Sequence, residues 1–382
     1  MTDRVVVTGM GLRTPLGSDL ETLWARLLSG ESASQHWPDL AAENFPIASA
    51  CRLQDFEVSG DPTRRGRDLA VAAARDALTD SDLDGDDRIG VFVGTTMGES
   101  AAFEAAADGA ELRIDEAAGS VFAAEVARDR GLAGPLRTYG TACAAGNYAL
   151  GAAATAVRKG TVTAAVSGGV EPFSKIAMLG FARSRAMSGD LCRPFDRARA
   201  GMQLGEAAAL LVLEREDQAL ARGRDPLAVV GGLGLSGDAF HPTAPREDGS
   251  GMAAAMRAGL AAAGIGPSEV GWVCAHGTGT LRSDAAEARA LHTVFGDQTP
   301  PVASVKGALG HSLGAATAVQ AVVAVQALRT RTLPPNANLV EPDDSLMLDV
   351  VIEPRPAPEL RWIMSCGYAF GGLNSALVLG RA

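Results

Sequence analysis

RVVVTGMG, residues 4–11, is a valine-rich run that ends in glycines, and AVVGGLG, residues 228–234, repeats the pattern later in the chain. Runs of β-branched residues bounded by glycine are typical of buried strands. Each run opens a stretch in which further strand-like segments alternate with Ala-rich helical segments. These strand-like segments are residues 89–93, 162–166, 209–213, 272–274 and 376–379. The alternation predicts an α/β protein built from layers of strands and helices.

The repeated run also predicts a duplicated α/β unit. The first unit would cover residues 1–226 and the second residues 227–382. Each unit holds one reactive side chain directly before an Ala-rich helical segment, Cys143 in the first and His311 in the second. We therefore expect two similar halves that pack into one layered body.

Composition excludes several classes of function for this chain of 382 residues, whose formal net charge is −11. Binding to nucleic acid or to an anionic membrane requires basic surface. The longest apolar stretch, near residues 315–328, is interrupted by Gln320 and Gln326, and no signal peptide is visible at the N-terminus. The five cysteines are scattered and suit reduced thiols rather than a metal site. We expect a cytoplasmic protein that binds no metal, nucleic acid or membrane.

Cys143 lies in YGTACAAGN, residues 139–147, where small neighbours would let a bulky substrate approach. A helix that begins just after it would direct free N–H groups and a positive dipole end at the thiol. Both lower a thiol pKa, and the same N–H groups can hold an oxyanion. An isolated cysteine is more often a small buried core residue. The two histidines described next favour a nucleophile instead.

His276 opens HGTGT after an apolar strand, and His311 lies in GHSLG at the start of a helix. Loops at strand ends are the usual place for chemistry in α/β folds. A neutral imidazole that donates through Nε2 can stabilise a thioester oxygen or an enolate. A lone histidine is more often structural. A thiol with two imidazoles, however, can carry an acyl group and direct a second acyl unit onto it.

Lys306 lies five residues before His311, in a chain that has only three lysines. A lysine is a compact point charge, which the bulky, planar guanidinium of arginine does not imitate. Lys306 would hold His311 neutral and add positive potential. Glu287, on the helix after Thr280, is either a counter-ion for Lys306 or a solvated helix residue, and both interpretations stay open.

Two further segments are candidates for function. FGGLN, residues 370–374, places an aromatic ring on a glycine hinge that could open and close a pocket, although a core phenylalanine before a final strand fits as well. Arg64, Arg65 and Arg67 form a basic cluster before a helical segment at residues 69–78. In an acidic protein this cluster is either a docking site for an acidic partner or an ordinary solvated helix start.

Together these motifs resemble the β-ketoacyl-acyl-carrier-protein synthases of the thiolase superfamily. The resemblance runs nearly end to end and covers residues 5–11, 141–146, 193–196 (RPFD) and 276–280, Lys306 with His311, and residues 370–374. It implies a five-layered αβαβα fold, usually in a homodimer, and 3-oxoacyl-[acyl-carrier-protein] synthase activity, which is an acyltransferase activity. It implies no bound cofactor, because the substrates are carried on the phosphopantetheine of acyl carrier protein.

The resemblance also implies a role for each candidate residue. Cys143 would take an acyl group, and His276 and His311 would assist decarboxylation of a malonyl unit whose carbanion attacks the Cys143 thioester. Lys306 would belong to the same catalytic set as the two histidines. Phe370 would gate the pocket, and its N–H group and that of Cys143 would form the oxyanion hole. The other implied sites are substrate binding by Thr243, Thr278, Thr280 and Gly371, and docking of the acidic carrier on Arg64, Arg65, Arg67 and Arg199.

The sequence departs from the family pattern without losing a catalytic residue. The departures are Ala200, Ala207, Ala209, Cys274, Ser283 and Ala369. They favour a specialised type II polyketide or fatty-acid pathway over housekeeping synthesis. Starter group, chain length, and homodimer versus heterodimer with a related subunit stay open. Two alternative functions remain, a transferase that forms acyl-Cys143 without elongation and a partner subunit that shapes chain length.

Overall fold

A computed structural model describes residues 3–83 and 88–382 of the chain. Its main sheet has ten strands in the order β10-β9-β13-β14-β8-β1-β7-β6-β4-β5. Of the ten strands of the main sheet, the first five along the chain are β1 (Val5–Arg13), β4 (Ile89–Gly94), β5 (Leu136–Tyr139), β6 (Ala164–Glu171) and β7 (Ala207–Arg215). The other five are β8 (Ala228–Gly237), β9 (Val270–Cys274), β10 (Val302–Ala303), β13 (Trp362–Ala369) and β14 (Leu373–Gly380).

The two sets of strands are arranged in the same way. Taken from the outer edge inward, β5-β4-β6-β7-β1 in the first set corresponds position by position to β10-β9-β13-β14-β8 in the second. The parallel and antiparallel pairings also correspond. β1 pairs with β8 through Val5–Val7 and joins the sets into one sheet. This shared topology supports a duplicated unit, and the predicted boundary between residues 226 and 227 lies in the loop before β8 and stays a prediction.

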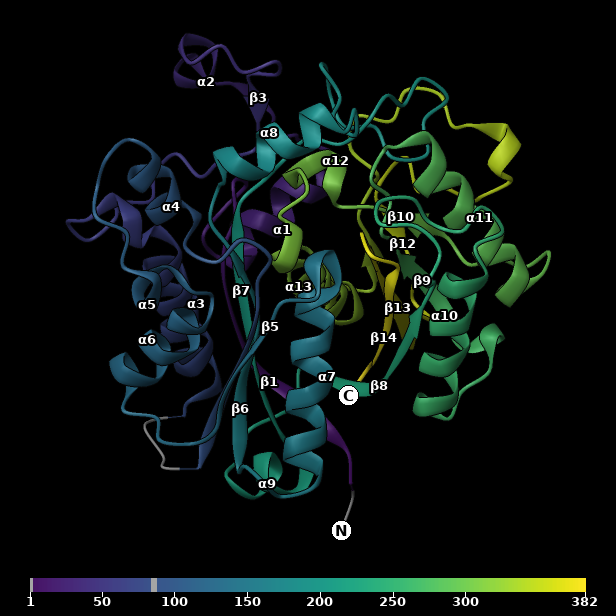
Figure 1. Ribbon diagram of the computed structural model, residues 1–382. Coiled ribbons are helices and arrows are strands. Elements are labelled where there is room, and N and C mark those ends of the chain that lie inside the picture. Colours follow the sequence, from purple (N-terminus) through teal and green to yellow (C-terminus); the bar gives the residue numbers. More distant parts are fainter. Residues whose placement is uncertain (1–2, 84–87) are drawn as a thin grey trace.

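Helices cover both faces of this sheet and form the predicted five layers (Figure 1). α3 (Arg65–Ser81) and α6 (Ser120–Arg130) cover the first set of strands on the outside, and α10 (Ser250–Ala263) and α11 (Leu281–Phe295) cover the second. α7 (Ala145–Arg158) and α13 (Ala316–Thr330) lie between the two sets. The remaining helices are α1 (Leu20–Leu28), α2 (Pro38–Ala42), α4 (Ser100–Ala107), α5 (Ile114–Ala117), α8 (Lys175–Arg183), α9 (Glu216–Ala221) and α12 (Lys306–Leu309).

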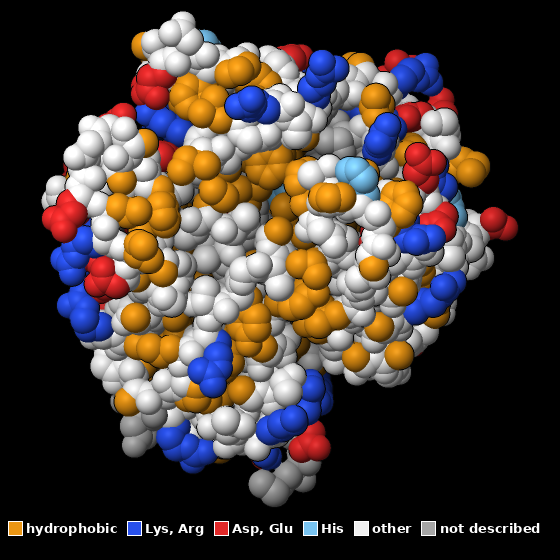
Figure 2. Space-filling view, in the orientation of Figure 1, with side chains coloured by type: hydrophobic (Ala, Val, Ile, Leu, Met, Phe, Trp, Pro, Cys, Tyr) orange, Lys and Arg blue, Asp and Glu red, His pale blue; other side chains and the backbone are white. Residues whose placement is uncertain are grey.

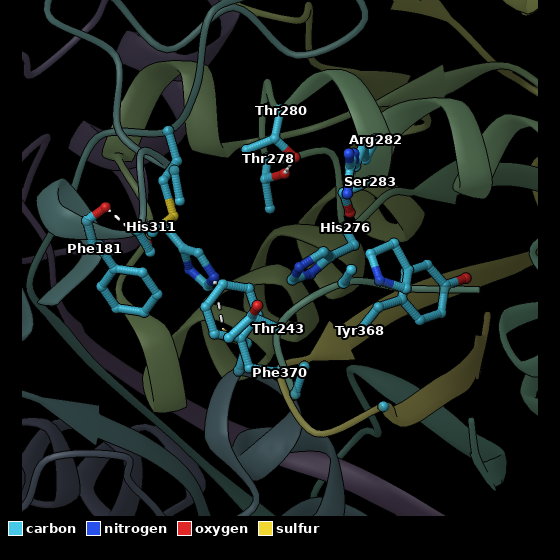
Figure 3. A pocket seen from close by; sticks show the side chains of 18 of the residues that line it. Phe181, Thr243, His276, Thr278, Thr280, Arg282, Ser283, His311, Tyr368 and Phe370 are labelled. Atoms are coloured by element: carbon cyan, nitrogen blue, oxygen red, sulfur yellow. Dashed lines mark hydrogen bonds between the residues drawn. The ribbon is translucent and has the colours of Figure 1, made fainter. Parts of the chain in front are cut away.

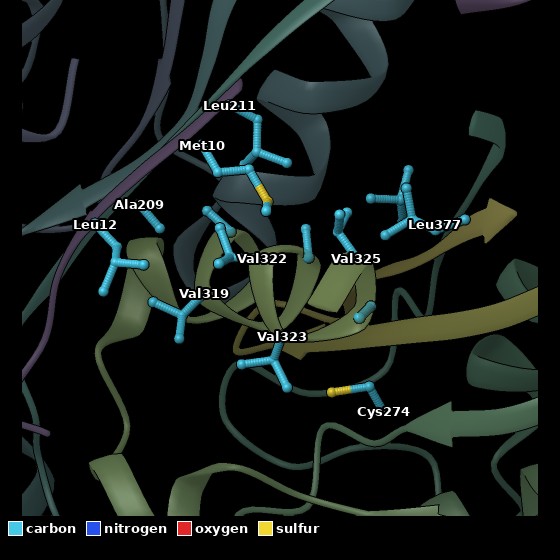
Figure 4. Packing of buried hydrophobic residues seen from close by; sticks show 14 of the residues in the cluster. Met10, Leu12, Ala209, Leu211, Cys274, Val319, Val322, Val323, Val325 and Leu377 are labelled. Carbon is cyan, nitrogen blue, oxygen red and sulfur yellow. The ribbon is translucent and has the colours of Figure 1, made fainter. Parts of the chain in front are cut away.

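The centre of the molecule is α13, which is buried and mostly apolar over Ala316–Val325 and reaches the surface at its C-terminal end. Its valines pack against both sets of strands, including Met10 and Leu12 of β1 and Leu377 of β14 (Figure 4). The stretch Leu313–Thr330 is long and apolar enough to cross a membrane, but 83% of it is buried inside the molecule. It therefore fits the core helix predicted from the sequence.

Glycines at the ends of the two valine-rich runs bring helices close to the sheet. A Cβ atom on Gly9 or Gly11 of β1 would lie 2.2 or 2.0 Å from a carbonyl oxygen of α3. In β8, a Cβ atom on Gly234 would lie 1.9 Å from the carbonyl oxygen of Ala255 in α10. The glycines thus allow each outer helix to pack directly on the strand that opens its half. This packing fixes the layer spacing on which the site depends.

Candidate active site

Cys143 is positioned by a sharp turn at the start of α7. The residue before it, Ala142, has φ of +47°, a left-handed conformation that is unusual for a residue with a side chain. A single 3-10 turn, Ala142–Ala144, then leads into α7. The second half repeats this turn before α13, where Leu313 has φ of +40°. The thiol therefore lies at a helix N-terminus, where backbone N–H groups are free.

His311 touches the thiol, since its Nε2 lies 3.1 Å from Cys143 Sγ. The N–H of Leu313 donates to Nδ1 of the same ring over 3.2 Å. An Nδ1 that accepts a hydrogen bond carries no proton, so the proton of the neutral ring is on Nε2. Burial and the charge of Lys306 hold the pKa of His311 well below its usual value. His311 is therefore neutral at pH 7 and donates from Nε2 towards the sulphur.

The thiol itself is not activated in the free protein, contrary to the sequence prediction. Cys143 is only 6% exposed, and this burial raises its pKa to about 12. Lys306 and the N–H groups of Cys143 and Phe370 act in the opposite direction and favour the thiolate. The helix N-terminus is where we expected it, but desolvation outweighs it. The same two N–H groups, which act on one sulphur, are those predicted to form the oxyanion hole.

His276 is held by two carboxylates from one face of α11. Asp284 and Glu287 are three residues apart, so both project towards the loop that carries His276. Glu287 accepts the N–H groups of His276 and Gly277, each over 2.8 Å. Asp284 accepts those of Thr278 and Gly279 over 3.0 and 3.2 Å. The loop is therefore fixed through its backbone, which leaves the imidazole free for chemistry.

The two imidazoles meet edge to face, with ring centroids 5.5 Å apart and an angle of 83° between the planes. Tyr368 packs on the other side of His276, with centroids 5.6 Å apart. Burial, Lys306 and His311 lower the pKa of His276 well below its usual value. Its buried Nδ1 has no hydrogen-bond partner among the described residues. Two neutral imidazoles thus converge on one thiol.

Lys306 stands behind the histidines and is only 1% exposed. Its Nζ donates to the carbonyl oxygen of His276 over 2.5 Å and to Oε1 of Gln320 over 3.1 Å. Glu287 is fully buried, which excludes the solvated-helix interpretation. It is not a direct counter-ion either, because no ion pair within 4 Å joins it to Lys306 in the described part of the chain. Glu287 is instead a backbone clamp whose charge acts on Lys306 from a longer distance.

A cavity of about 480 Å³ opens onto this group (Figure 3). Its lining includes all the predicted catalytic and substrate-binding residues except Lys306, namely Cys143, His276, His311, Phe370, Thr243, Thr278, Thr280 and Gly371. Ala200, Ser283 and Ala369, three of the departures from the family pattern, line it as well. Sequence reasoning missed further lining residues, among them Phe181, Arg185, Arg282 and Tyr368.

Phe370 lies at the mouth of the cavity, in the turn between β13 and β14. Its side chain is 38% exposed, and its ring packs on Phe181 of α8 with centroids 5.4 Å apart. Gly371 and Gly372 follow with φ of +84° and +74°, values that favour glycine. The predicted hinge therefore lies at the mouth of the cavity that contains Cys143, and the ring of Phe370 is held there by its contact with Phe181.

The predicted docking arginines turn inward. Arg199 is buried and donates to the carboxylate of Asp343 over 2.6 Å, with Asp284 3.8 Å away. Arg67 is buried too and lies among the carboxylates of Glu99, Glu116 and Glu125. The docking prediction is wrong for both, because a guanidinium that is desolvated and internally paired offers no charge to a partner.

The other two arginines of the basic cluster also have partners within the chain. Arg65 forms a two-point bond to the fully buried carboxylate of Glu206, over 2.7 and 2.9 Å. Arg64 remains partly exposed but bonds to Glu125 over 3.1 Å. Neither lines the cavity. Arg65 therefore anchors the start of α3 and keeps less exposed surface than Arg64, with side chains 22% and 34% exposed.

Exposed arginines do lie at the cavity mouth, at positions far apart in the sequence. Arg185, at the end of α8, and Arg282, at the start of α11, both line the cavity and are both exposed. Within residues 3–83 and 88–382, no carboxylate lies within 4 Å of either guanidinium. Figure 2 shows Lys and Arg side chains along the upper part of this face, above a region where hydrophobic side chains gather. The mouth is thus locally basic although the protein is acidic.

Comparisons with known proteins agree with this geometry. The family descriptions "Beta-ketoacyl synthase, N-terminal domain" and "Beta-ketoacyl synthase, C-terminal domain" match residues 2–219 and 227–340. The 3-oxoacyl-[acyl-carrier-protein] synthase 2 of Staphylococcus aureus (strain COL) is 34% identical over 408 residues, with 98% of this chain and 97% of the relative covered.

Two solved structures are similar over almost the whole chain. The ishigamide ketosynthase/chain length factor has a TM-score of 0.94 and 36% identity, with 99% of both chains covered. A type II PKS acyl-carrier protein in complex with its ketosynthase has a TM-score of 0.91 and 26% identity, again with 99% of both chains covered. Both family matches together span more than half of the sequence. The chain therefore belongs to the β-ketoacyl synthase family and is an acyltransferase-class enzyme.

Proposed function

We propose that this protein is a 3-oxoacyl-[acyl-carrier-protein] synthase that joins an acyl group on Cys143 to a malonyl unit by decarboxylative Claisen condensation. The observation that carries the proposal is the contact of 3.1 Å between His311 Nε2 and Cys143 Sγ, with neutral His276 in the same cavity. A thiol needs only one base to be acylated. Two neutral, proton-donating imidazoles suit a reaction that must also stabilise an enolate.

In the first step, the sulphur of Cys143 attacks the thioester carbonyl of an acyl carrier. The carbon–sulphur bond to the carrier breaks, and the carrier leaves as a thiol that takes the proton lost by Cys143. The N–H groups of Cys143 and Phe370 favour negative charge at the sulphur, and we place the oxyanion of the tetrahedral intermediate between them. Because the thiol pKa is about 12 in the free protein, this step depends on the approach of the substrate.

In the second step, a malonyl thioester loses carbon dioxide. The carbon–carbon bond breaks, and its electron pair forms an enolate whose oxygen accepts hydrogen bonds from His276 and His311. The enolate carbon then attacks the carbonyl of acyl-Cys143, and the Cys143 thiolate is released from the β-ketoacyl product. Both imidazoles stay neutral because burial and Lys306 keep their pKa values low. A protonated imidazole would instead pair with the malonyl carboxylate and oppose its loss.

The partner we propose is an acyl carrier protein whose phosphopantetheine arm enters at the locally basic mouth. The arm would pass Thr243 and the hydroxyls of Thr278 and Thr280, which lie 2.9 Å from each other. The exposed, unpaired guanidinium groups of Arg185 and Arg282 would attract the acidic carrier. A structural relative was solved in complex with its acyl-carrier protein, which supports this choice of partner.

We also propose that the protein acts as a catalytic subunit of a homodimer or heterodimer in a type II pathway. One structural relative is a ketosynthase/chain length factor, so pairing with a related subunit has a precedent among its neighbours. The retained Cys143 favours the catalytic role over the chain-length-shaping one. The five free, buried cysteines suit the reducing cytoplasm.

Release of carbon dioxide and formation of acyl-enzyme, measured in parallel, test this proposal. Wild-type protein should do both with acyl and malonyl carriers. We expect His276→Ala to acylate Cys143 but to release carbon dioxide at least about a hundredfold more slowly, the usual contribution of a positioned proton donor. A protein that forms acyl-Cys143 and never releases carbon dioxide would be the non-elongating transferase.

A further inference from the structure

Gln320, on the buried helix α13, links Lys306 to the two strands that carry the site. Its Oε1 accepts a hydrogen bond from Lys306 Nζ over 3.1 Å. Its Nε2 donates to the carbonyl oxygens of Cys274, Ala275 and Cys366 over 3.1, 3.2 and 3.0 Å. The side chain is fully buried. One amide therefore connects the ammonium group to the end of β9, just before His276, and to β13.

The surroundings of Gln320 select an amide over a carboxylate. The carbonyl oxygens on one side require a donor, and the ammonium group on the other side requires an acceptor. A neutral amide offers both in one planar group of this size. An ionised glutamate would direct its negative charge at three carbonyl oxygens at a fully buried position.

Because Gln320 is neutral, the ammonium group of Lys306 has no carboxylate in contact with it in the described part of the chain. Within residues 3–83 and 88–382, no carboxylate lies within 4 Å of Nζ, whose two acceptors are the amide of Gln320 and a backbone carbonyl. The ionisable groups that act on Lys306 from surrounding elements are Glu287, Cys143, Cys192 and Cys274. In turn, Lys306 acts on the histidines and on Cys143.

We propose that Gln320 is a positioning residue that holds Lys306 against the His276 loop without placing a carboxylate in contact with it, so that the positive charge of Lys306 acts on both imidazoles and on the Cys143 thiol. This inference rests on the proposed function for its effect on condensation. Its electrostatic part concerns only this chain and can be measured without substrate.

Gln320→Glu is the direct test, because it keeps the size of the side chain and adds one negative charge beside Lys306. A charge at this distance shifts a neighbouring pKa by about one unit or more. The Cys143 pKa should rise, so alkylation by iodoacetamide at pH 8 should slow about tenfold for each unit. The pKa values of His276 and His311 should also rise. In a plot of condensation rate against pH, the acid limb, where the rate increases with pH, should therefore move to higher pH by about one unit.

Gln320→Met is the second variant, and it should change the opposite limb. It removes the acceptor of Lys306 without adding charge, so the lysine pKa falls further. The ammonium group then loses its proton at lower pH, and the alkaline limb of the condensation profile should move to lower pH. A role in packing alone would lower activity equally at all pH values in both variants.

The same helix offers a matched control, Gln326→Glu, whose side chain bonds to Arg329 away from the cavity. It should leave the alkylation rate and both limbs unchanged. The proposal is overturned if Gln320→Glu folds with an unchanged rate of Cys143 alkylation, or if Gln326→Glu slows it equally. If wild-type protein shows no condensation while alkylation still responds to Gln320→Glu, the proposed function fails and the electrostatic inference survives.

Discussion

Replacing Arg199 by methionine separates an internal role from a docking role for this side chain. Arg199 is 4% exposed and is the charge partner of Asp343, with Asp284 3.8 Å away. Methionine keeps most of the volume but leaves both carboxylates unpaired. Removing one partner of a buried pair costs about 3–5 kcal/mol. Unfolding entropy of about 2.1 cal/mol/K per residue gives about 0.8 kcal/mol/K for this chain, so the expected loss in Tm is about 4–6 °C.

The assay combines thermal unfolding with steady-state kinetics against acyl carrier protein. Asp284 clamps the loop of His276, so Arg199→Met should also lower kcat, whereas KM for the carrier should stay within about twofold. Arg282→Ala is the matched control, since this exposed arginine at the mouth should raise KM for the carrier and leave Tm within about 1 °C. The reasoning is refuted if Arg199→Met raises KM for the carrier while Tm stays unchanged.

Three further predictions follow from the packing and the pKa shifts. The rate of Cys143 alkylation in the free enzyme should rise about tenfold per pH unit from pH 7 to pH 10, because the thiol pKa is raised to about 12; a rate that is half-maximal near pH 8.5 and levels off towards pH 10 would show an ordinary thiol. Gly234→Ala should prevent α10 from packing and lower the free energy of unfolding by about 3 kcal/mol or more, whereas Gly237→Ala, with nothing within 4 Å of its Cβ atom, should be tolerated in thermal unfolding. Phe370→Ala removes the ring at the mouth of the cavity, so acyl-Cys143 should form at the normal rate but should be hydrolysed about tenfold faster, as followed by mass spectrometry. Hydrolysis at the wild-type rate would argue against a gate.

The layered fold and the catalytic group were predictable because their signals are local. The glycine-ended valine runs mark the strands that open each half, and the same glycines receive the outer helices in the structure. Short turns before two Ala-rich helices marked Cys143 and His311. Strand β5 is short and half polar, and β10 has two residues, so neither gave a periodic signal.

Pairings between distant residues were not predictable from one sequence. Arg65 and Arg67 look like a basic patch because their partners Glu206 and Glu99 lie far away in the chain. Gln320 looked like a polar interruption of an apolar helix, and only the fold shows that it faces Lys306. The thiol pKa was predicted in the wrong direction, because a helix N-terminus can be read from sequence whereas the depth of burial cannot.

The most direct test of the account is intact-mass spectrometry of the carrier protein after incubation of the enzyme with acyl and malonyl carriers. The account predicts a carrier that bears the acyl group extended by two carbons as a β-ketoacyl thioester, formed by wild-type protein and absent with Cys143→Ala. Elongated carrier in equal amount with Cys143→Ala, or acylated enzyme with no elongated carrier at all, would contradict it.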